Sequence, residues 1–215
     1  MKTSVRLALL AILISLVSAC VSNRTVALMP EQTQTIKNTE FTKTAIIKMV
    51  SDQRVFEDKP RQAHIPSLKG GKAASASVEL KARAIARKRS PYGRAKGDVV
   101  LPEGQTVTAL VHTRVSNALQ QAGYQVVATQ DIPADLIVEV KIDKLWMWVR
   151  PEVWAVRVNS QIETLISTNV AKPFMVKNKH SVVRPVVINT LWAEVLDESL
   201  NQYEDELTDE LKKLP

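Results

Sequence analysis

The segments LIVEVKI, residues 136–142, and VWAVRVNSQIETLIS, residues 153–167, decide the fold because apolar residues recur at every second position. Glu139 and Lys141 fall between the apolar positions of the first segment. Successive side chains of a β-strand point to opposite faces, so the pattern predicts two strands that each bury one face. An antiparallel sheet with one solvated face is the usual setting for such strands. Residues 172–183 are a third candidate strand.

Two segments on either side of these strands have helical periodicity. Residues 106–122 carry apolar side chains at three- and four-residue steps, with Val115 and Leu119 at the centre of the stripe and Asn117 on the polar side. Residues 187–214 carry a second apolar stripe. The sequence therefore predicts two long amphipathic helices, each with one buried face.

The N-terminal half of the chain is less regular. Residues 44–50 are a short apolar run that predicts a buried first strand, and residues 57–77 are rich in proline, glycine and small residues that predict a long loop. Residues 78–89 fit either a helix or a strand. We favour a strand that forms a hairpin with residues 97–101. Residues 124–127 predict an edge strand.

The first twenty residues, MKTSVRLALLAILISLVSAC, are organised like an export signal. Lys2 and Arg6 supply positive charge, and the apolar run over residues 7–16 is too short to span a bilayer comfortably. Val17-Ser18-Ala19-Cys20 then looks like a bacterial lipobox. The sequence predicts a signal peptide over residues 1–19 and lipidation of Cys20. The alternative is an ordinary secretory signal that is cut elsewhere, so that the cysteine is discarded.

Lipidation would set the location and topology of the chain. Two or three acyl chains anchor a protein stably without a membrane-spanning helix. Val21 follows Cys20, which resembles the signal for transfer to the outer membrane in enteric-type bacteria. We expect residues 20–43 to be a lipidated N-terminus and tether, and residues 44–215 to form a single domain that faces the periplasm.

The predicted elements indicate an α+β fold. Helices that bury one stripe each pack most simply on one face of a sheet. We expect a two-layer sandwich, in which a mixed, mostly antiparallel sheet carries two long helices on one face. The chain has one cysteine, so packing must stabilise the domain without an internal disulfide.

Charge is distributed unevenly along a chain whose formal net charge is +7. Residues 81–96 contain basic but no acidic side chains, and residues 194–210 contain acidic but no basic ones. If the basic segment is extended, Arg83, Arg87 and Arg89 share one strand face and form a candidate partner-binding row. The row would either bind an anionic partner or neutralise the acidic helix of the same molecule, and we favour the second. After export we expect no nucleic-acid partner.

No enzyme motif is recognisable in the chain. It lacks a nucleophile elbow, a Walker loop and a dinucleotide-binding glycine pattern. His64, His112 and His180 are scattered without metal-ligand spacing. Ser51-Asp52 follows the first predicted strand, but a lone carboxylate does not define a catalytic site. We therefore expect a protein that is not an enzyme, with no catalytic residue, no cofactor and no metal.

Three of the four tryptophans, Trp146, Trp148 and Trp154, fall within nine residues. Pro151-Glu152 between them predicts a turn between two strands, and continued alternation places Trp146 and Trp148 on the face of Ile142. Two interpretations remain open. The tryptophans fill the core at the base of a hairpin, or they form an exposed aromatic tip that contacts a partner, a ligand or the lipid interface. They are candidate partner-binding residues.

Several short motifs resemble, in their order, the uncharacterised YajG-like bacterial lipoproteins. They are Ser51-Asp52-Gln53-Arg54, LQQAGYQVV over residues 119–127, and Ala134-Asp135-Leu136. AIARKR over residues 84–89 and GDVVL over residues 97–101 look like one branch of that group. The resemblance extends over roughly residues 44–210 and implies a periplasm-facing α/β domain on an outer-membrane anchor. It carries over no catalytic or binding residue, and the tryptophan cluster departs from typical members.

We therefore expect a non-enzymatic, outer-membrane-anchored lipoprotein that serves as an accessory, partner-binding module of the envelope. Its expected partners are the membrane, through lipid on Cys20, and an envelope protein, through a sheet edge or the tryptophan hairpin. The alternative is binding of an anionic envelope component, such as a lipid headgroup, lipopolysaccharide or peptidoglycan, by residues 81–96. Steep salt dependence of binding would distinguish this alternative.

Overall fold

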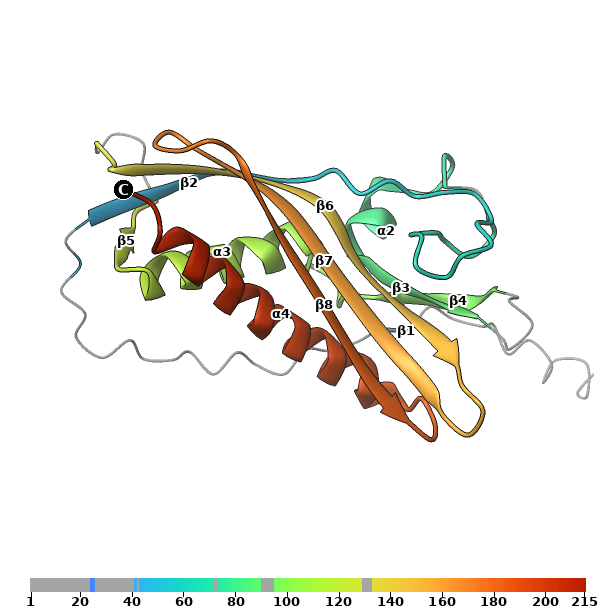
Figure 1. Ribbon diagram of the computed structural model, residues 1–215. Helices are drawn as coiled ribbons and strands as arrows, with labels where there is room; N and C mark the ends of the chain where they lie inside the picture. The colour runs from blue at the N-terminus through green and yellow to red at the C-terminus, as the bar shows by residue number, and fades with distance from the viewer. Residues whose placement is uncertain (1–23, 26–40, 42, 72, 90–94, 129–132) are drawn as a thin grey trace, which may run out of the picture.

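The computed structural model describes residues 24–25, 41, 43–71, 73–89, 95–128 and 133–215 (Figure 1). The signal segment, Cys20 and most of the predicted tether lie outside the described residues. Within them the elements are β1 (Arg24–Thr25), β2 (Lys43–Asp52), α2 (Val78–Arg83), β3 (Ala84–Arg89), β4 (Ala95–Val100), α3 (Val107–Gln121), β5 (Tyr124–Val126), β6 (Leu136–Pro151), β7 (Val156–Thr168), β8 (Phe174–Arg184) and α4 (Asn189–Leu211). None of the described helices is long and apolar enough to cross a membrane.

Strand β6 is the centre of the sheet. Along one edge it pairs antiparallel with β7, which pairs antiparallel with β8. Along its other edge, β2 runs parallel to the first half of β6, from Leu136 to Ile142, and β3 meets β6 further along, at Met147. β4 pairs antiparallel with β3, while β1 and β5 add parallel to β4 and β2. The sheet is curled and mixed (Figure 1), which confirms the prediction of an α+β fold with a mixed sheet.

Helices α3 and α4 contact each other and bury their apolar stripes against the sheet. The Thr106 hydroxyl caps α3 by accepting a hydrogen bond of 3.1 Å from the amide of Ala109. Gly123, with φ of 93°, takes the left-handed conformation that ends this helix. Val115 and Leu119 are buried in the main core, as predicted. The two-layer sandwich with both long helices on one face stays a prediction, because the curled sheet also carries α2 and a second hydrophobic cluster.

Residues 78–89 divide between a helix and a strand, so the prediction of one extended segment is wrong for its first half. The Ser77 hydroxyl accepts a hydrogen bond of 3.1 Å from the Leu80 amide and begins helix α2. The backbone becomes extended at Ala84, where β3 starts. The expected hairpin therefore forms only between β3 and β4.

A β-bulge in β6 decides which of its side chains face each of the two hydrophobic clusters. The register with β7 shifts between Ile142 and Lys144, and a shift of one residue exchanges the two faces of a strand. Before the bulge, Ile142 faces the main core; after it, Leu145 and Met147 do so. Trp146 belongs to the second cluster, whose buried members are Leu68, Ala84, Val100 and Trp146. The prediction that Trp146 and Trp148 share the face of Ile142 is therefore wrong.

Candidate functional site

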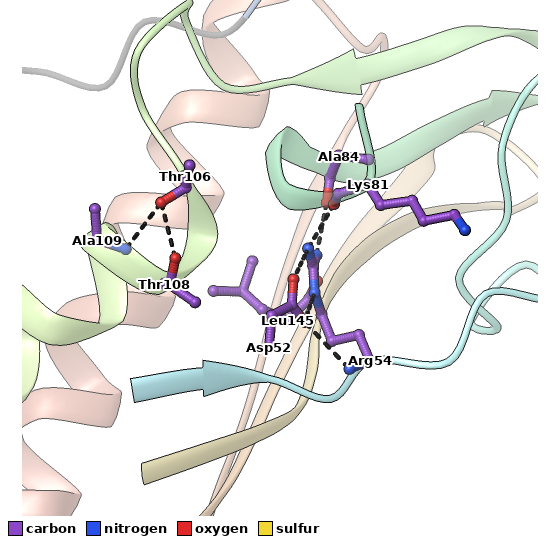
Figure 2. Close-up of polar contacts among 8 residues, drawn as sticks. All are labelled: Asp52, Arg54, Lys81, Ala84, Thr106, Thr108, Ala109 and Leu145. Atoms are coloured by element: carbon purple, nitrogen blue, oxygen red, sulfur yellow. Dashed lines mark hydrogen bonds and ion pairs between the residues drawn. The ribbon is translucent and has the colours of Figure 1, made fainter. Parts of the chain in front are cut away.

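Arg54 fills the fork between β2 and β3 along the edge of β6 (Figure 2). Its Nη1 donates hydrogen bonds to the carbonyl oxygens of Ala84 at 2.6 Å and Leu145 at 3.1 Å. Its Nη2 donates to the carbonyl oxygen of Lys81, at 2.7 Å. These three carbonyls belong to β3, β6 and α2. The guanidinium therefore supplies hydrogen bonds at a point where this edge of β6 lies between its pairing with β2 and its pairing with β3, while β7 pairs with the opposite edge.

Asp52 balances the buried charge of Arg54. Nε and Nη2 of Arg54 donate to the two Asp52 carboxylate oxygens, at 2.8 and 2.7 Å, in a bidentate pair. Ser51 Oγ donates to the carbonyl oxygen of Val140, at 3.3 Å. Ser51-Asp52, the weak catalytic candidate, therefore bonds within the fold, and the arginine of the same motif lies in the interior.

The three arginines of the predicted basic row do not lie on one strand face. Arg83 belongs to helix α2, where its Nε donates to the carbonyl oxygen of Leu101 at 3.0 Å and its Nη1 pairs with Glu79 at 3.1 Å. The row fails because Ser77 caps a helix that takes Arg83 out of the extended segment.

Arg87 and Arg89 both contact the loop over residues 57–77. Both donate to Ser67 Oγ, at 3.0 and 3.5 Å, and Arg89 also donates to the carbonyl oxygen of Pro60, at 2.9 Å. Burial lowers the pKa of each guanidinium from its ordinary value. These arginines hold the loop against β3, and the favoured role of neutralising the acidic helix is wrong for both.

Asp98 on β4 holds the same loop from the neighbouring strand. Its two carboxylate oxygens accept hydrogen bonds from the backbone amide of Lys69, at 2.9 and 3.1 Å. Burial raises the pKa of the Asp98 carboxyl, while the Lys69 amide and the charge of Arg87 act against that rise. The basic segment and Asp98 together anchor the loop to the sheet.

Trp146 and Trp148 lie in or beside the second hydrophobic cluster. Trp146 is fully buried, its Nε1 donates to the carbonyl oxygen of Ala63 at 3.2 Å, and its ring packs edge-on against Phe56 with centroids 5.9 Å apart. Trp148 is half-buried, with its ring centroid 6.0 Å from that of His64. For Trp146 the core interpretation is confirmed.

Trp154 lies instead in the loop at the tip of the β6–β7 hairpin. The Glu152 amide donates to the carbonyl oxygen of Ala155, at 2.9 Å, and closes this short loop. The loop leaves Trp154 91% exposed and Val153 86% exposed. The structure therefore separates the three candidate tryptophans: Trp146 is buried, Trp148 is half-buried and Trp154 is almost fully exposed.

Charged side chains surround the hairpin tip. Arg157 Nε lies 2.6 Å from the carboxylate of Glu152, and Arg184 at the end of β8 pairs with Glu194 of α4 at 2.7 Å. Arg150 is exposed. An open hollow at the tip is lined by residues 150–155 and by Arg157. The tip therefore combines apolar side chains with nearby guanidinium groups.

A polar network between α3 and α4 escaped the sequence analysis. Arg114 Nη1 pairs with the Glu204 carboxylate at 3.1 Å, and the amide nitrogens of Asn117 and Gln121 donate to the same carboxylate at 3.3 and 2.6 Å. The sequence places Asn117 on the polar side of its helix and Glu204 in the acidic segment, and it predicts no bond between the two residues. The signal that could have predicted this network is the presence of opposite charges on two amphipathic helices of one domain.

The described part of the chain holds no group of three or more His, Cys, Asp or Glu side chains suited to a metal ion. His112 is exposed on α3, and His180 Nδ1 lies 3.1 Å from Gln202 Nε2. The hairpin tip, where Val153 and Trp154 are exposed, is the region that we consider for a function.

No family model matches the chain, and no curated protein matches its sequence. Among solved structures, a Xanthomonas campestris protein of the DUF330 family is 12% identical with a TM-score of 0.44, over 87% of this chain and 90% of that one. A minor lipoprotein from Acinetobacter baumannii is 14% identical with a TM-score of 0.33, over 52% and 91%. A lipoprotein from Neisseria meningitidis is 12% identical with a TM-score of 0.26, over 75% and 99%. With TM-scores below 0.5, none of these likenesses identifies a fold or a function for this chain.

Proposed function

We propose that this chain is a non-enzymatic lipoprotein that acyl chains on Cys20 anchor in the outer membrane, with its domain in the periplasm. In this proposal it is an accessory module of the envelope, and the tip of the β6–β7 hairpin is its contact surface. The observation that carries the proposal is the 91% exposure of Trp154 on a loop closed by its own hydrogen bond. Tryptophan is enriched among the residues that dominate binding energy.

The anchor and the family are supported by the sequence. The lipobox at Cys20 supports the anchor, and Val21 supports the outer membrane as its destination. The order of the motifs supports membership of the YajG-like lipoproteins. Arg54 and Asp52, which belong to the first of these motifs, have a structural role at the fork of the sheet.

The alternative function, binding of an anionic envelope component by residues 81–96, has less support. Arg83, Arg87 and Arg89 all donate hydrogen bonds within the domain. A partner would have to compete with these bonds for the guanidinium groups. Among the described residues of this segment, 81–89 and 95–96, the bonds of the three arginines favour a structural role over this function.

Photocrosslinking in living cells tests the proposed contact surface. A photoreactive phenylalanine analogue that replaces Trp154 is expected to form adducts with an envelope component. The matched control places the analogue at Val78, which is 83% exposed at the start of α2. Adducts at position 154 but not at position 78 are the expected result. The absence of adducts at 154 in a folded, exported protein would contradict the proposed role of the tip.

A further inference from the structure

We infer that the component at the hairpin tip is lipid: the tip docks on the bilayer that holds the Cys20 anchor, so that Trp154 and the acyl chains enter the same leaflet. This inference rests on the proposed anchor and names the partner of the same surface. Three observations carry it: the composition of the surface, the charges around it, and the direction in which the strands run.

The surface is an apolar patch built from two neighbouring turns, which we call the tip patch. Val153 and Trp154 come from the β6–β7 loop, and Val186, 62% exposed, and Ile188, 57% exposed, follow β8. The register pairs Val156 with Arg184, so the end of β8 lies beside the base of the hairpin (Figure 1). Large apolar side chains that gather at one end of a domain mark an interaction site.

The side chains around the tip patch suit a lipid surface. Arg150, Arg157 and Arg184 lie at the hairpin base and the end of β8. Long basic side chains can follow an apolar surface while their charges reach the headgroups, and tryptophan favours the boundary between acyl chains and headgroups. Two of these arginines pair with Glu152 and Glu194. The net positive charge is therefore small, and apolar contact dominates the interaction.

The strand directions place the start of β1 toward the end of the sheet that carries the tip patch. β3 runs parallel to β6, with Ala86 opposite Met147, so the C-terminal ends of both strands point the same way. β4 runs antiparallel to β3, and β1 runs parallel to β4, with Arg24 opposite Val99. The N-terminal ends of β1 and β4 therefore point in the direction of the β6–β7 loop.

The anchor is close enough to the tip for both to reach one membrane surface. Cys20 precedes Arg24 by four residues, a chain length of at most about 14 Å. β4 and β3 separate β1 from β6, so Arg24 lies three strand spacings, about 14 Å, from β6 across the sheet. Along the strands Arg24 is level with Met147, seven residues or about 23 Å before Trp154. A bilayer that holds the acyl chains of Cys20 therefore meets Trp154 when the sheet is inclined to the membrane. A protein partner at the tip would have to fit between the domain and its own membrane.

Quenching by brominated lipid tests this inference on the full-length acylated protein. The protein is reconstituted into vesicles of phosphatidylethanolamine and phosphatidylglycerol, with or without bromine on the acyl chains. Bromine quenches only tryptophans that lie near the acyl chains, and Trp146 and Trp192 are buried in the domain. We expect brominated lipid to lower the emission of the wild type much more than that of Trp154→Phe. Val153→Asp should reduce the quenching, whereas Val78→Asp should leave it unchanged.

Three other outcomes would each contradict a different part of the inference: the anchor, the lipid contact or the choice of lipid as partner. Mass spectrometry that shows no acyl group on Cys20 would overturn the anchor, and with it the proposed function. An acylated protein whose wild type and Trp154→Phe variant are quenched equally would overturn the lipid contact alone. If position 154 instead crosslinks to a protein in cells and is not quenched, the tip binds a protein. Identical thermal melts of the variants show that the fold is intact in each comparison.

Discussion

Along one edge of β6, the pairing with β2 ends at Ile142 and the pairing with β3 occurs at Met147. Arg54 supplies hydrogen bonds in the gap between them. Its guanidinium holds the carbonyls of Ala84 and Leu145 and the carboxylate of Asp52. The Arg54→Ala variant would leave these groups without a donor in the interior. Removal of one partner of a buried ion pair costs about 3–5 kcal/mol, so we expect a loss of that size in the free energy of unfolding in urea.

The control for Arg54 is Arg184, whose ion pair with Glu194 is half exposed. Such surface pairs contribute about 0–1 kcal/mol, so Arg184→Ala is expected to unfold almost as the wild type does. Arg54→Lys should also lose stability, because one ammonium group cannot reproduce a planar set of donors. Equal losses for Arg54→Ala and Arg184→Ala would show that the fork is held by other contacts.

Asp135 and Asp98 are expected to change the pH dependence of stability in opposite directions. The Thr44 amide, 2.7 Å from Asp135 Oδ2, lowers the pKa of Asp135. Its contribution is therefore present above the unfolded-state pKa and is lost as the pH falls through the folded-state pKa. Burial raises the pKa of Asp98, so its contribution is present below the unfolded-state pKa and is lost as the pH rises.

The two Asn variants separate these effects. Relative to the wild type, Asp135→Asn should lose stability as the pH rises through the acid range, and Asp98→Asn should gain it. Urea titrations at a series of pH values measure both trends. Parallel trends for the two variants would contradict the assignment of burial to Asp98 or of hydrogen bonding to Asp135.

At the scale of elements, helix α3 has one buried apolar face and, beside it, polar side chains that bond to α4. Leu119 is fully buried against the sheet, and Leu119→Ala should cost about 2–5 kcal/mol through lost contact and a residual cavity. Asn117 donates to Glu204 on α4, at 3.3 Å, so Asn117→Ala should cost about 1 kcal/mol. His112→Ala on the exposed side is the control and should change little. A loss for Asn117→Ala as small as for His112→Ala would mean that the α3–α4 network adds no stability.

The bulge in β6 sets which residues of the strand face the main core and which face the second cluster. Deletion of Asp143 would remove the register shift and turn Leu145 and Met147 away from the main core. We expect this deletion to abolish cooperative thermal unfolding. Asp143→Ala keeps the chain length, and because the residue is exposed it should change stability by no more than about 0.5 kcal/mol. A deletion variant that melts like the wild type would show that the bulge can move along the strand.

The sequence predicts those elements whose periodicity is unbroken. Residues 136–142 and 106–122 follow one period throughout, and the strand and helix there agree with the structure. Residues 78–89 change from a helix to a strand at Ala84, so no single period fits the whole segment. The change of face at residue 143 depends on pairing with β7. Trp146 therefore could not be assigned to a cluster before the partner strand was known.

At the scale of the whole molecule, the anchor decides where the domain can act. If Cys20 carries acyl chains, each buried CH₂ contributes about 0.8 kcal/mol, and two or three chains hold the protein on the membrane without further contacts. The tip patch alone buries only a few side chains.

We therefore expect Cys20→Ser to move the protein from the membrane fraction to the soluble fraction, or to leave an unprocessed precursor. Trp154→Ser should stay in the membrane fraction, because it changes the orientation of the domain and not its retention. Cell fractionation and intact-mass analysis of the N-terminus measure both variants, and a mature wild-type N-terminus other than acylated Cys20 would refute the anchor.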